Sequence, residues 1–306
     1  MSQPVPLHIK TISEYHRILR LPKPLHSLVS LIRFEDMPYH PDQAPRSIVH
    51  NFYSIALKKS FHARLKYGQQ EVDFDEGILL FMAPMQVLSI EGPFETVASH
   101  QGWLLLIHPD LFWNTHLAKK IRQYEYFEYK ANEALHVSDA EEHLLIGIMQ
   151  NIAREYEART DIFSHDVIIA QLELLFTYAE RFYQRQFMTR KVSNHQIIGR
   201  MEELLNEYFK GDDLQSKGMP SVSYFADALH LSPNYLSRLL KTLTGQSTKD
   251  LIINKVVDIA KEKLSTTDLT INEIAYALGF DHPQAFSKMF KSKANLSPVS
   301  FRRSFN

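Results

Sequence analysis

Four polar side chains near the end of the chain have types and spacing that suit contact with a nucleic acid. They are Gln284, Ser287, Lys288 and Lys291, which recur at the spacing of one helix face. Glutamine pairs with adenine through two hydrogen bonds, and hydroxyl and ammonium groups reach base edges or phosphates. The chemistry that this set indicates is recognition of double-stranded DNA, with no covalent bond made or broken.

The helix that must position these side chains has an apolar opposite side. Phe286, Met289 and Phe290 lie there, and Pro283 stands at the first helical position, where proline is favoured. The helix therefore has one core face and one face able to meet DNA, which is the division that a recognition helix needs.

A shorter helix is predicted just upstream. Thr270 and Glu273 have the spacing of a capping box, and Gly279 supplies a stop. The segment from Thr270 to Arg303 therefore indicates a helix-turn-helix. An ordinary amphipathic helical hairpin with a solvated charged face has the same pattern.

An internal repeat favours the DNA-binding interpretation. Residues 225 to 241 (FADALHLSPNYLSRLLK) repeat residues 274 to 291 (IAYALGFDHPQAFSKMFK), with one extra residue in the second turn. A helix from about 248 to 264 is predicted to join these two units. Residues early in a recognition helix reach base edges, and later ones meet the backbone. The predicted base contacts are Asn234, Ser237, Arg238, Gln284, Ser287 and Lys288, and the predicted phosphate contacts are Lys241 and Lys291.

On these residues the region 194 to 306 resembles the DNA-binding domain of the AraC/XylS family of transcription regulators. The sequence departs from the family at Asn295, where glycine is usual, and at Lys288, where arginine is commoner. Asparagine tolerates the left-handed turn that glycine would supply, so the motif is expected to survive. The residues that carry the resemblance are Ile274, Ala275, Gly279, Phe280, Phe286, Ser287, Phe290, Lys291, Pro298, Phe301 and Arg302.

The resemblance implies a sequence-specific transcription regulator whose partner is promoter or operator DNA. It implies RNA polymerase as a further partner if the protein activates. The family commonly carries a cupin-like barrel before the DNA-binding domain, so a small effector bound in that barrel is expected. The effector, the operator sequence and the direction of regulation are left open.

The composition is that of a globular protein with a real core. The 306 residues are 44% hydrophobic and 23% charged, which suits two or more domains, and the absence of cysteine excludes disulfides and thiolate chemistry. No leader or membrane-spanning run is evident, so a cytoplasmic location is expected. From residue 194 onward 14 Lys and Arg face 12 Asp and Glu, against 20 and 23 upstream, so the basic excess accompanies the predicted recognition helices.

The first half has a different pattern, with short apolar runs separated by polar residues, glycine and proline between residues 28 and 109. Residues 61 to 67 (FHARLKY) alternate as a half-buried strand does, and the turn at 73 to 77 leads into an apolar strand. Such a meander predicts a small barrel or jelly roll, and residues 68 to 84 weakly resemble a cupin.

A metal-dependent or sugar-binding cupin enzyme fused to a DNA-binding tail is the alternative. No two of the fifteen histidines are separated by one residue, and His100, His108 and His116 lack the neighbours that a metallocupin uses. No nucleophile motif or phosphate-binding glycine loop is present. We therefore predict no metal, no cofactor and no enzymatic activity.

Two helices are predicted after the barrel, and the second has a long apolar stripe. The stripe either packs on the barrel within one subunit or forms a subunit interface, as helices in this position often do in the family. We expect a homodimer. The predicted interface residues are Ile168, Leu172, Leu175, Phe176 and Ala179.

The sequence thus predicts a multidomain α+β protein with an all-α C-terminal domain that carries two helix-turn-helix motifs. The expected parts are a cupin-like sensor at 1–135, a helical dimerisation segment at 136–187, a hinge at 188–193 and the AraC-type DNA-binding domain at 194–306.

Overall fold

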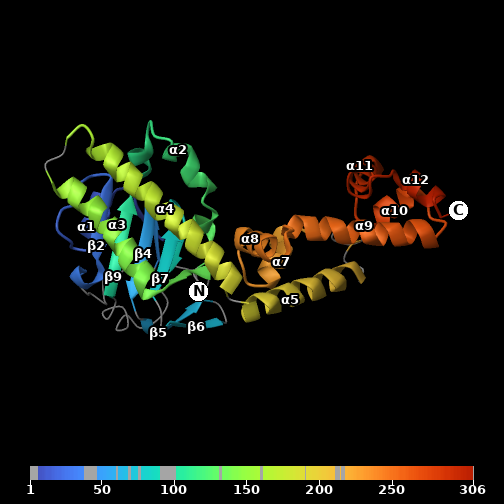
Figure 1. Cartoon of the computed structure of the whole chain (residues 1–306), viewed down its shortest axis with the longest axis horizontal. Helices are drawn as coiled ribbons and strands as arrows, with labels where there is room; N and C mark the ends of the chain where they lie inside the picture. The colour runs from blue at the N-terminus through green and yellow to red at the C-terminus, as the bar shows by residue number, and fades with distance from the viewer. Residues whose placement is uncertain are drawn as a thin grey trace. The chain divides into compact units, whose positions relative to one another are not determined.

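The computed structural model describes most of the chain. The described residues are 6–37, 47–59, 61–67, 70–74, 77–89, 101–130, 133–158, 161–189, 191–210, 214 and 218–305. The chain forms two compact units, Met1–Gln186 and Phe187–Asn306 (Figure 1). The division falls beside the predicted hinge, where α4 runs to Thr189 and α5 starts at Lys191. The domain boundaries given above stay predictions.

Strands dominate the first part of the N-terminal unit. A five-stranded sheet has the order β10-β7-β4-β9-β2, a three-stranded sheet has the order β1-β3-β8, and β5 pairs with β6. All described pairings are antiparallel except that of β1 with β3. The strands are β1 (Leu7–Ile9), β2 (Val29–Arg33), β3 (Ser47–His50), β4 (Tyr53–Lys59), β5 (Phe61–Tyr67), β6 (Gln70–Phe74), β7 (Gly77–Met82), β8 (Val87–Ser89), β9 (Gln101–Ile107) and β10 (Leu135–Val137).

Helices complete this unit, and the longest two cross in front of the five-stranded sheet in Figure 1. Ser138 and Glu141 close the predicted capping box at the start of α3. The helices are α1 (Ile12–Ile18), α2 (Leu117–Lys120), α3 (Asp139–Glu157) and α4 (Ser164–Thr189), and the short 3-10 turns are η1 (Phe34–Asp36), η3 (Pro109–Phe112), η4 (Ile121–Gln123) and η5 (Glu125–Glu128).

The α+β class of this unit is confirmed, as is the all-α class of the C-terminal unit described below. Strand β5 confirms the alternating segment 61 to 67 as a strand. Among the described strands the pairings give three separate sheets. The cupin-like character of the first 135 residues stays a prediction.

The apolar stripe of α4 is buried inside the subunit. Phe176 lies 5.1 Å from Tyr124 and 5.8 Å from Phe127 between ring centroids, and its carbonyl accepts a hydrogen bond from the Tyr126 hydroxyl. Phe81 of β7 joins this cluster at 4.4 Å from Tyr126. The helix therefore packs on the sheet through aromatic rings.

The predicted interface residues need a correction for this reason. Each is at most 2% exposed within a single chain, so none can reach a second subunit while this core is packed. The periodicity correctly predicted that the apolar stripe is covered, but the aromatic cluster of the same subunit covers it, and not a second subunit. These residues are Ile168, Leu172, Leu175, Phe176 and Ala179.

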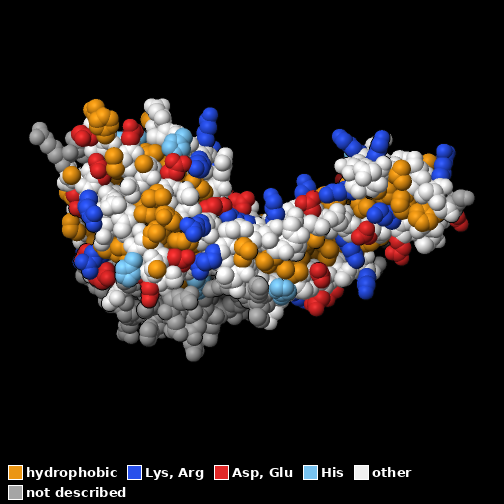
Figure 2. Space-filling model, in the orientation of Figure 1, with side chains coloured by type: hydrophobic (Ala, Val, Ile, Leu, Met, Phe, Trp, Pro, Cys, Tyr) orange, Lys and Arg blue, Asp and Glu red, His pale blue; other side chains and the backbone are white. Residues whose placement is uncertain are grey.

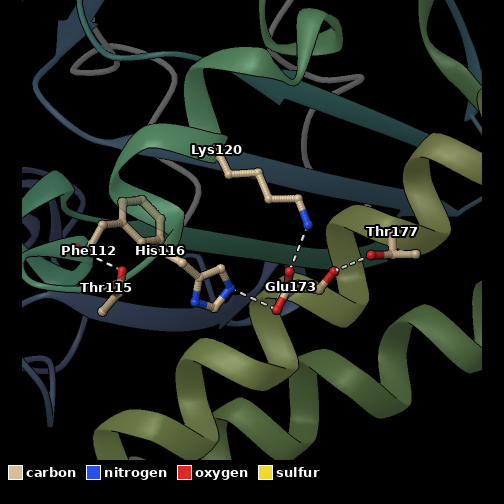
Figure 3. Close-up of polar contacts among 6 residues, drawn as sticks. All are labelled: Phe112, Thr115, His116, Lys120, Glu173 and Thr177. Carbon is tan, nitrogen blue, oxygen red and sulfur yellow. Dashed lines mark hydrogen bonds and ion pairs between the residues drawn. The ribbon is translucent and has the colours of Figure 1, made fainter.

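Polar contacts at the rim hold α4 beside α2. Glu173 accepts from Lys120 Nζ at 2.7 Å, and its second carboxylate oxygen lies 2.8 Å from His116 Nε2 (Figure 3). The Lys120 ammonium and the His116 ring hold the pKa of the Glu173 carboxyl below its usual range. Thr177 donates to the Glu173 carbonyl at 2.8 Å, and on the other side Thr115 donates to the carbonyl of Phe112 at 2.7 Å.

The burial of this stripe gives the first prediction. Phe176→Ala is expected to lower the free energy of unfolding by about 3–5 kcal/mol, because it leaves a cavity among packed rings. Met188→Ala is the matched control, since Met188 is 58% exposed on the same helix and should cost below about 1 kcal/mol. Urea unfolding of both full-length variants measures this. A Phe176→Ala protein that keeps wild-type stability but loses its partner subunit would contradict it.

Candidate nucleic-acid interface

The C-terminal unit contains only helices among its described elements. Each of the two shorter pairs, α7 with α8 and α10 with α11, forms one helix-turn-helix, and α9 joins them (Figure 1). The helices are α5 (Lys191–Lys210), α7 (Val222–Ala228), α8 (Pro233–Thr244), α9 (Thr248–Thr266), α10 (Ile271–Ala277), α11 (Pro283–Ala294) and α12 (Pro298–Arg303).

Local sequence fixes the first helix-turn-helix. Ser221 and Ser232 cap α7 and α8, each accepting a backbone N–H, and Pro233 opens α8. His230 takes a left-handed conformation in the turn, at φ 58°. Gly245 ends α8 at φ 77°.

The second helix-turn-helix forms as the sequence predicts. The Glu273 carboxylate accepts from the Thr270 N–H at 2.6 Å, and the Glu273 N–H donates to the Thr270 hydroxyl at 3.2 Å, which completes the capping box. Gly279 stands in the turn at φ 77°, and a Cβ there would meet the backbone of residues 218 and 219 at 3.0 Å. Asn295 ends α11 at φ 59°, so asparagine takes the left-handed position expected of it.

A single apolar core holds this second unit together. Phe286 and Phe290 of α11 are fully buried, with ring centroids 5.8 Å apart, and they pack with Ile274 of α10 and Val256 of α9. Because these rings occupy the inner side of α11, its polar side must point outward.

Helix α9 is fixed to both recognition helices. Near its start Ser237 of α8 donates to the buried Thr248 hydroxyl at 3.2 Å. Asp250 lies 3.0 Å from Lys293 of α11, and the hydroxyl of Ser247 together with this ammonium holds the pKa of Asp250 below its usual range. With 19 residues, α9 is about 28 Å long. It is therefore a rigid spacer between two recognition helices.

The predicted contacts on α11 lie together on an outward face. Gln284, Lys288 and Lys291 are exposed, and Ser287 is half-buried between them. Figure 2 shows Lys and Arg side chains gathered around α11. Hydrogen-bonding groups and positive charge thus occupy one side of the helix, as base and phosphate contact requires.

The predicted contacts on α8 are arranged differently. Lys241 is exposed, but Asn234, Ser237 and Arg238 are half-buried. The hydroxyl of Ser237 is engaged by Thr248, as described above. The Arg238 guanidinium lies 5.8 Å from the centre of the Phe187 ring. The two recognition helices therefore present unequal faces, although their sequences repeat.

Phe187 has a role in the core of this unit that the sequence did not predict. It is the last residue of the predicted dimerisation segment, just before the predicted hinge, yet it is fully buried, and its ring lies 5.1 Å from that of Tyr235 on α8. Asn194, also buried, donates to the Phe187 carbonyl at 2.6 Å. Phe187 continues the apolar stripe, four residues after Tyr183, so its spacing predicts that it is covered, but only the three-dimensional contacts show that Tyr235 covers it.

Arg302 has a structural role. Its guanidinium donates to the carbonyls of Leu264 and Leu269 at 3.2 and 2.6 Å, which ties α12 to the end of α9. Elsewhere in the described part of the chain no three His, Asp or Glu side chains group closely enough to hold a metal ion. No described helix is long and apolar enough to cross a bilayer.

Comparison with known proteins agrees with this geometry. The family described as a helix-turn-helix domain matches residues 225–304. The raffinose operon transcriptional regulatory protein RafR of Pediococcus pentosaceus is 36% identical over 76 residues, and YesN of Bacillus subtilis, an uncharacterised transcriptional regulatory protein, is 34% identical over 109. The C-terminal unit is an AraC-type DNA-binding domain.

The matches to these relatives cover only part of each chain. The RafR and YesN matches cover 25% and 35% of the chain, and 27% and 28% of the relatives' own lengths. Among solved structures, the C-terminal domain of AraT, a response regulator from Geobacillus stearothermophilus, is 32% identical, with 35% of this chain and 84% of that chain covered and a TM-score of 0.32.

The outward face of α11 gives the second prediction. Gln284→Ala is expected to relax the preference at one short block of the binding site, with about 1–3 kcal/mol of discrimination lost. Lys291→Ala, about two turns further along the same face of the helix, should weaken binding to all sequences alike and make the salt slope shallower by about one unit. A randomised-site binding assay at several salt concentrations distinguishes them. Uniform loss for Gln284→Ala would show that this side chain does not read bases.

Proposed function

We propose that the whole chain is a sequence-specific transcription regulator, whose AraC-type domain binds promoter DNA and whose N-terminal unit controls it in response to a small molecule. The observation that carries the proposal is the pair of helix-turn-helix units held by α9, with a basic and hydrogen-bonding face on α11. The regulators named above support the same activity for this domain. The proposal includes no catalytic step.

The direct test is selection of DNA fragments bound by the full-length protein from a random pool. One enriched sequence, bound by wild type and lost in Lys288→Ala/Lys291→Ala, is the expected result. Lys23→Ala/Lys119→Ala is a matched control, because it removes two exposed charges from the other unit. Recovery of unrelated fragments, whose affinity changes with salt concentration but not with sequence, would contradict sequence-specific regulation.

We further propose that two copies associate through the outward side of α4. Leu174 and Val167 are 42% and 38% exposed on this helix, and Phe163 just before it is 62% exposed. Figure 2 shows hydrophobic side chains gathered over α3 and α4. A surface of this kind on a monomer commonly marks an interaction site.

The order of charges along this side supports an antiparallel, two-fold pairing. Suppose that the Leu174 side chains of the two copies meet at the two-fold axis. Because residues 167 and 181 are equally far from residue 174, Arg181 of one copy then lies opposite Val167 of the other copy and next to its Asp166. Asp166 and Arg181 are both exposed, so each can form an ion pair across the interface. A dimer would engage two copies of a site and so raise the overall affinity.

The third prediction follows from this pairing. Leu174→Arg is expected to weaken self-association at least about tenfold, because it places two like charges at the two-fold axis. Leu25→Arg is the matched control, since Leu25 is 73% exposed outside α4. Analytical ultracentrifugation over a concentration series measures both. Equal association constants for the two variants, or a monomeric wild type at micromolar concentration, would contradict the pairing.

A further inference from the structure

The two recognition helices differ at two repeated positions. Arg238 of α8 aligns with Lys288 of α11, and one turn earlier Tyr235 aligns with Ala285. Lys288 and Ala285 are both exposed, whereas Arg238 is half-buried and Tyr235 is buried. The first recognition helix therefore carries an aromatic ring and a guanidinium at the positions where the second carries a methyl group and an ammonium.

The ring of Phe187 contacts both of these side chains of α8. It packs against the Tyr235 ring in an edge-to-face arrangement, with centroids 5.1 Å apart and an angle of 63° between the planes. The Arg238 guanidinium lies over the same ring, 5.8 Å from its centre. The face of an aromatic ring attracts a cation at this distance. Arg238 therefore has a preferred position on α8.

The Phe187 ring is itself held in place. It is fully buried, and the buried Asn194 side chain donates to the Phe187 carbonyl at 2.6 Å. Its aromatic neighbour Tyr235 lies in the first turn of α8, where the Tyr235 N–H donates to the Ser232 hydroxyl at 3.2 Å. The ring is thus a fixed support for the guanidinium.

A fixed guanidinium matters for reading guanine. Arginine pairs with guanine through two parallel hydrogen bonds, so the guanidinium plane must match the plane of the base. An arginine that already rests on a ring loses less conformational freedom when it pairs than one that moves freely. The Lys288 ammonium of α11 is a point charge and has no such plane. The two helices therefore differ in how strictly they can select a base.

We propose that Phe187 is a positioning residue for base recognition, whose ring holds the Arg238 guanidinium ready to pair with one guanine. The inference rests on the proposed function, for which it names one base of the binding site. A guanine is strictly required in the block that α8 contacts, and selection is less strict at the base that meets Lys288. Phe187 acts through Arg238 and does not itself contact DNA.

The test is a randomised-site selection with full-length variants, which gives the base preference at every position. Arg238→Ala is expected to abolish the preference for one guanine. Phe187→Leu keeps an apolar side chain but removes the ring face, so it should lower that preference at least about threefold and change other positions less than about twofold. Phe290→Leu is the matched control, because it alters an equally buried ring in α11 and should keep the guanine preference.

A double variant separates positioning from a general loosening of α8. In a protein that already carries Arg238→Ala, the further change Phe187→Leu should alter no base preference, because no guanidinium is left for the ring to hold. A further loss of preference at other positions of the α8 block would overturn the inference.

Pentafluorophenylalanine at position 187 guards against misfolding of Phe187→Leu. It nearly keeps the shape of the ring but reverses its charge distribution, so it should also lower the guanine preference, while near-ultraviolet circular dichroism reports the fold. An unchanged guanine preference with this ring, or equal weakening of every sequence by Phe187→Leu, would overturn the inference and leave the proposed function standing. Absence of any enriched sequence for wild type would overturn both.

Discussion

The rigid connection through α9 is the constraint on which DNA recognition by this chain depends. A helix of 19 residues resists bending, and it is tied to α8 through Ser237, to α11 through Lys293 and to α12 through Arg302. The second helix-turn-helix does not bury its apolar side alone, because Phe286 and Phe290 pack against α9 as well as α10. The same contacts that make the core therefore also set the separation of the recognition helices.

The N-terminal unit is organised by the two faces of its five-stranded sheet. One face is closed by α4 and the aromatic rings of Tyr124, Tyr126 and Phe127, which makes it a stable support. The other face is closed at one end by apolar side chains of α1, β1 and β3.

Local patterns predicted the C-terminal unit well because its elements begin and end at residues with a local physical reason. The Thr270 and Glu273 box, proline at 283 and the left-handed Asn295 all act within a few residues of chain. The stripe of α4 was equally clear, but periodicity shows that a face is covered and not what covers it, so the interface residues were wrong. The engagement of Arg238 by Phe187 joins residues far apart in sequence, which no local pattern contains.

The central claim is that two recognition helices of one chain, held apart by α9, meet one DNA site. Missing-base interference with the selected DNA fragment and the full-length protein tests it most directly. The account predicts two blocks of required bases on one face of the duplex, about one helical turn apart, or about 34 Å. A single block, or interference spread evenly along the fragment, would contradict it.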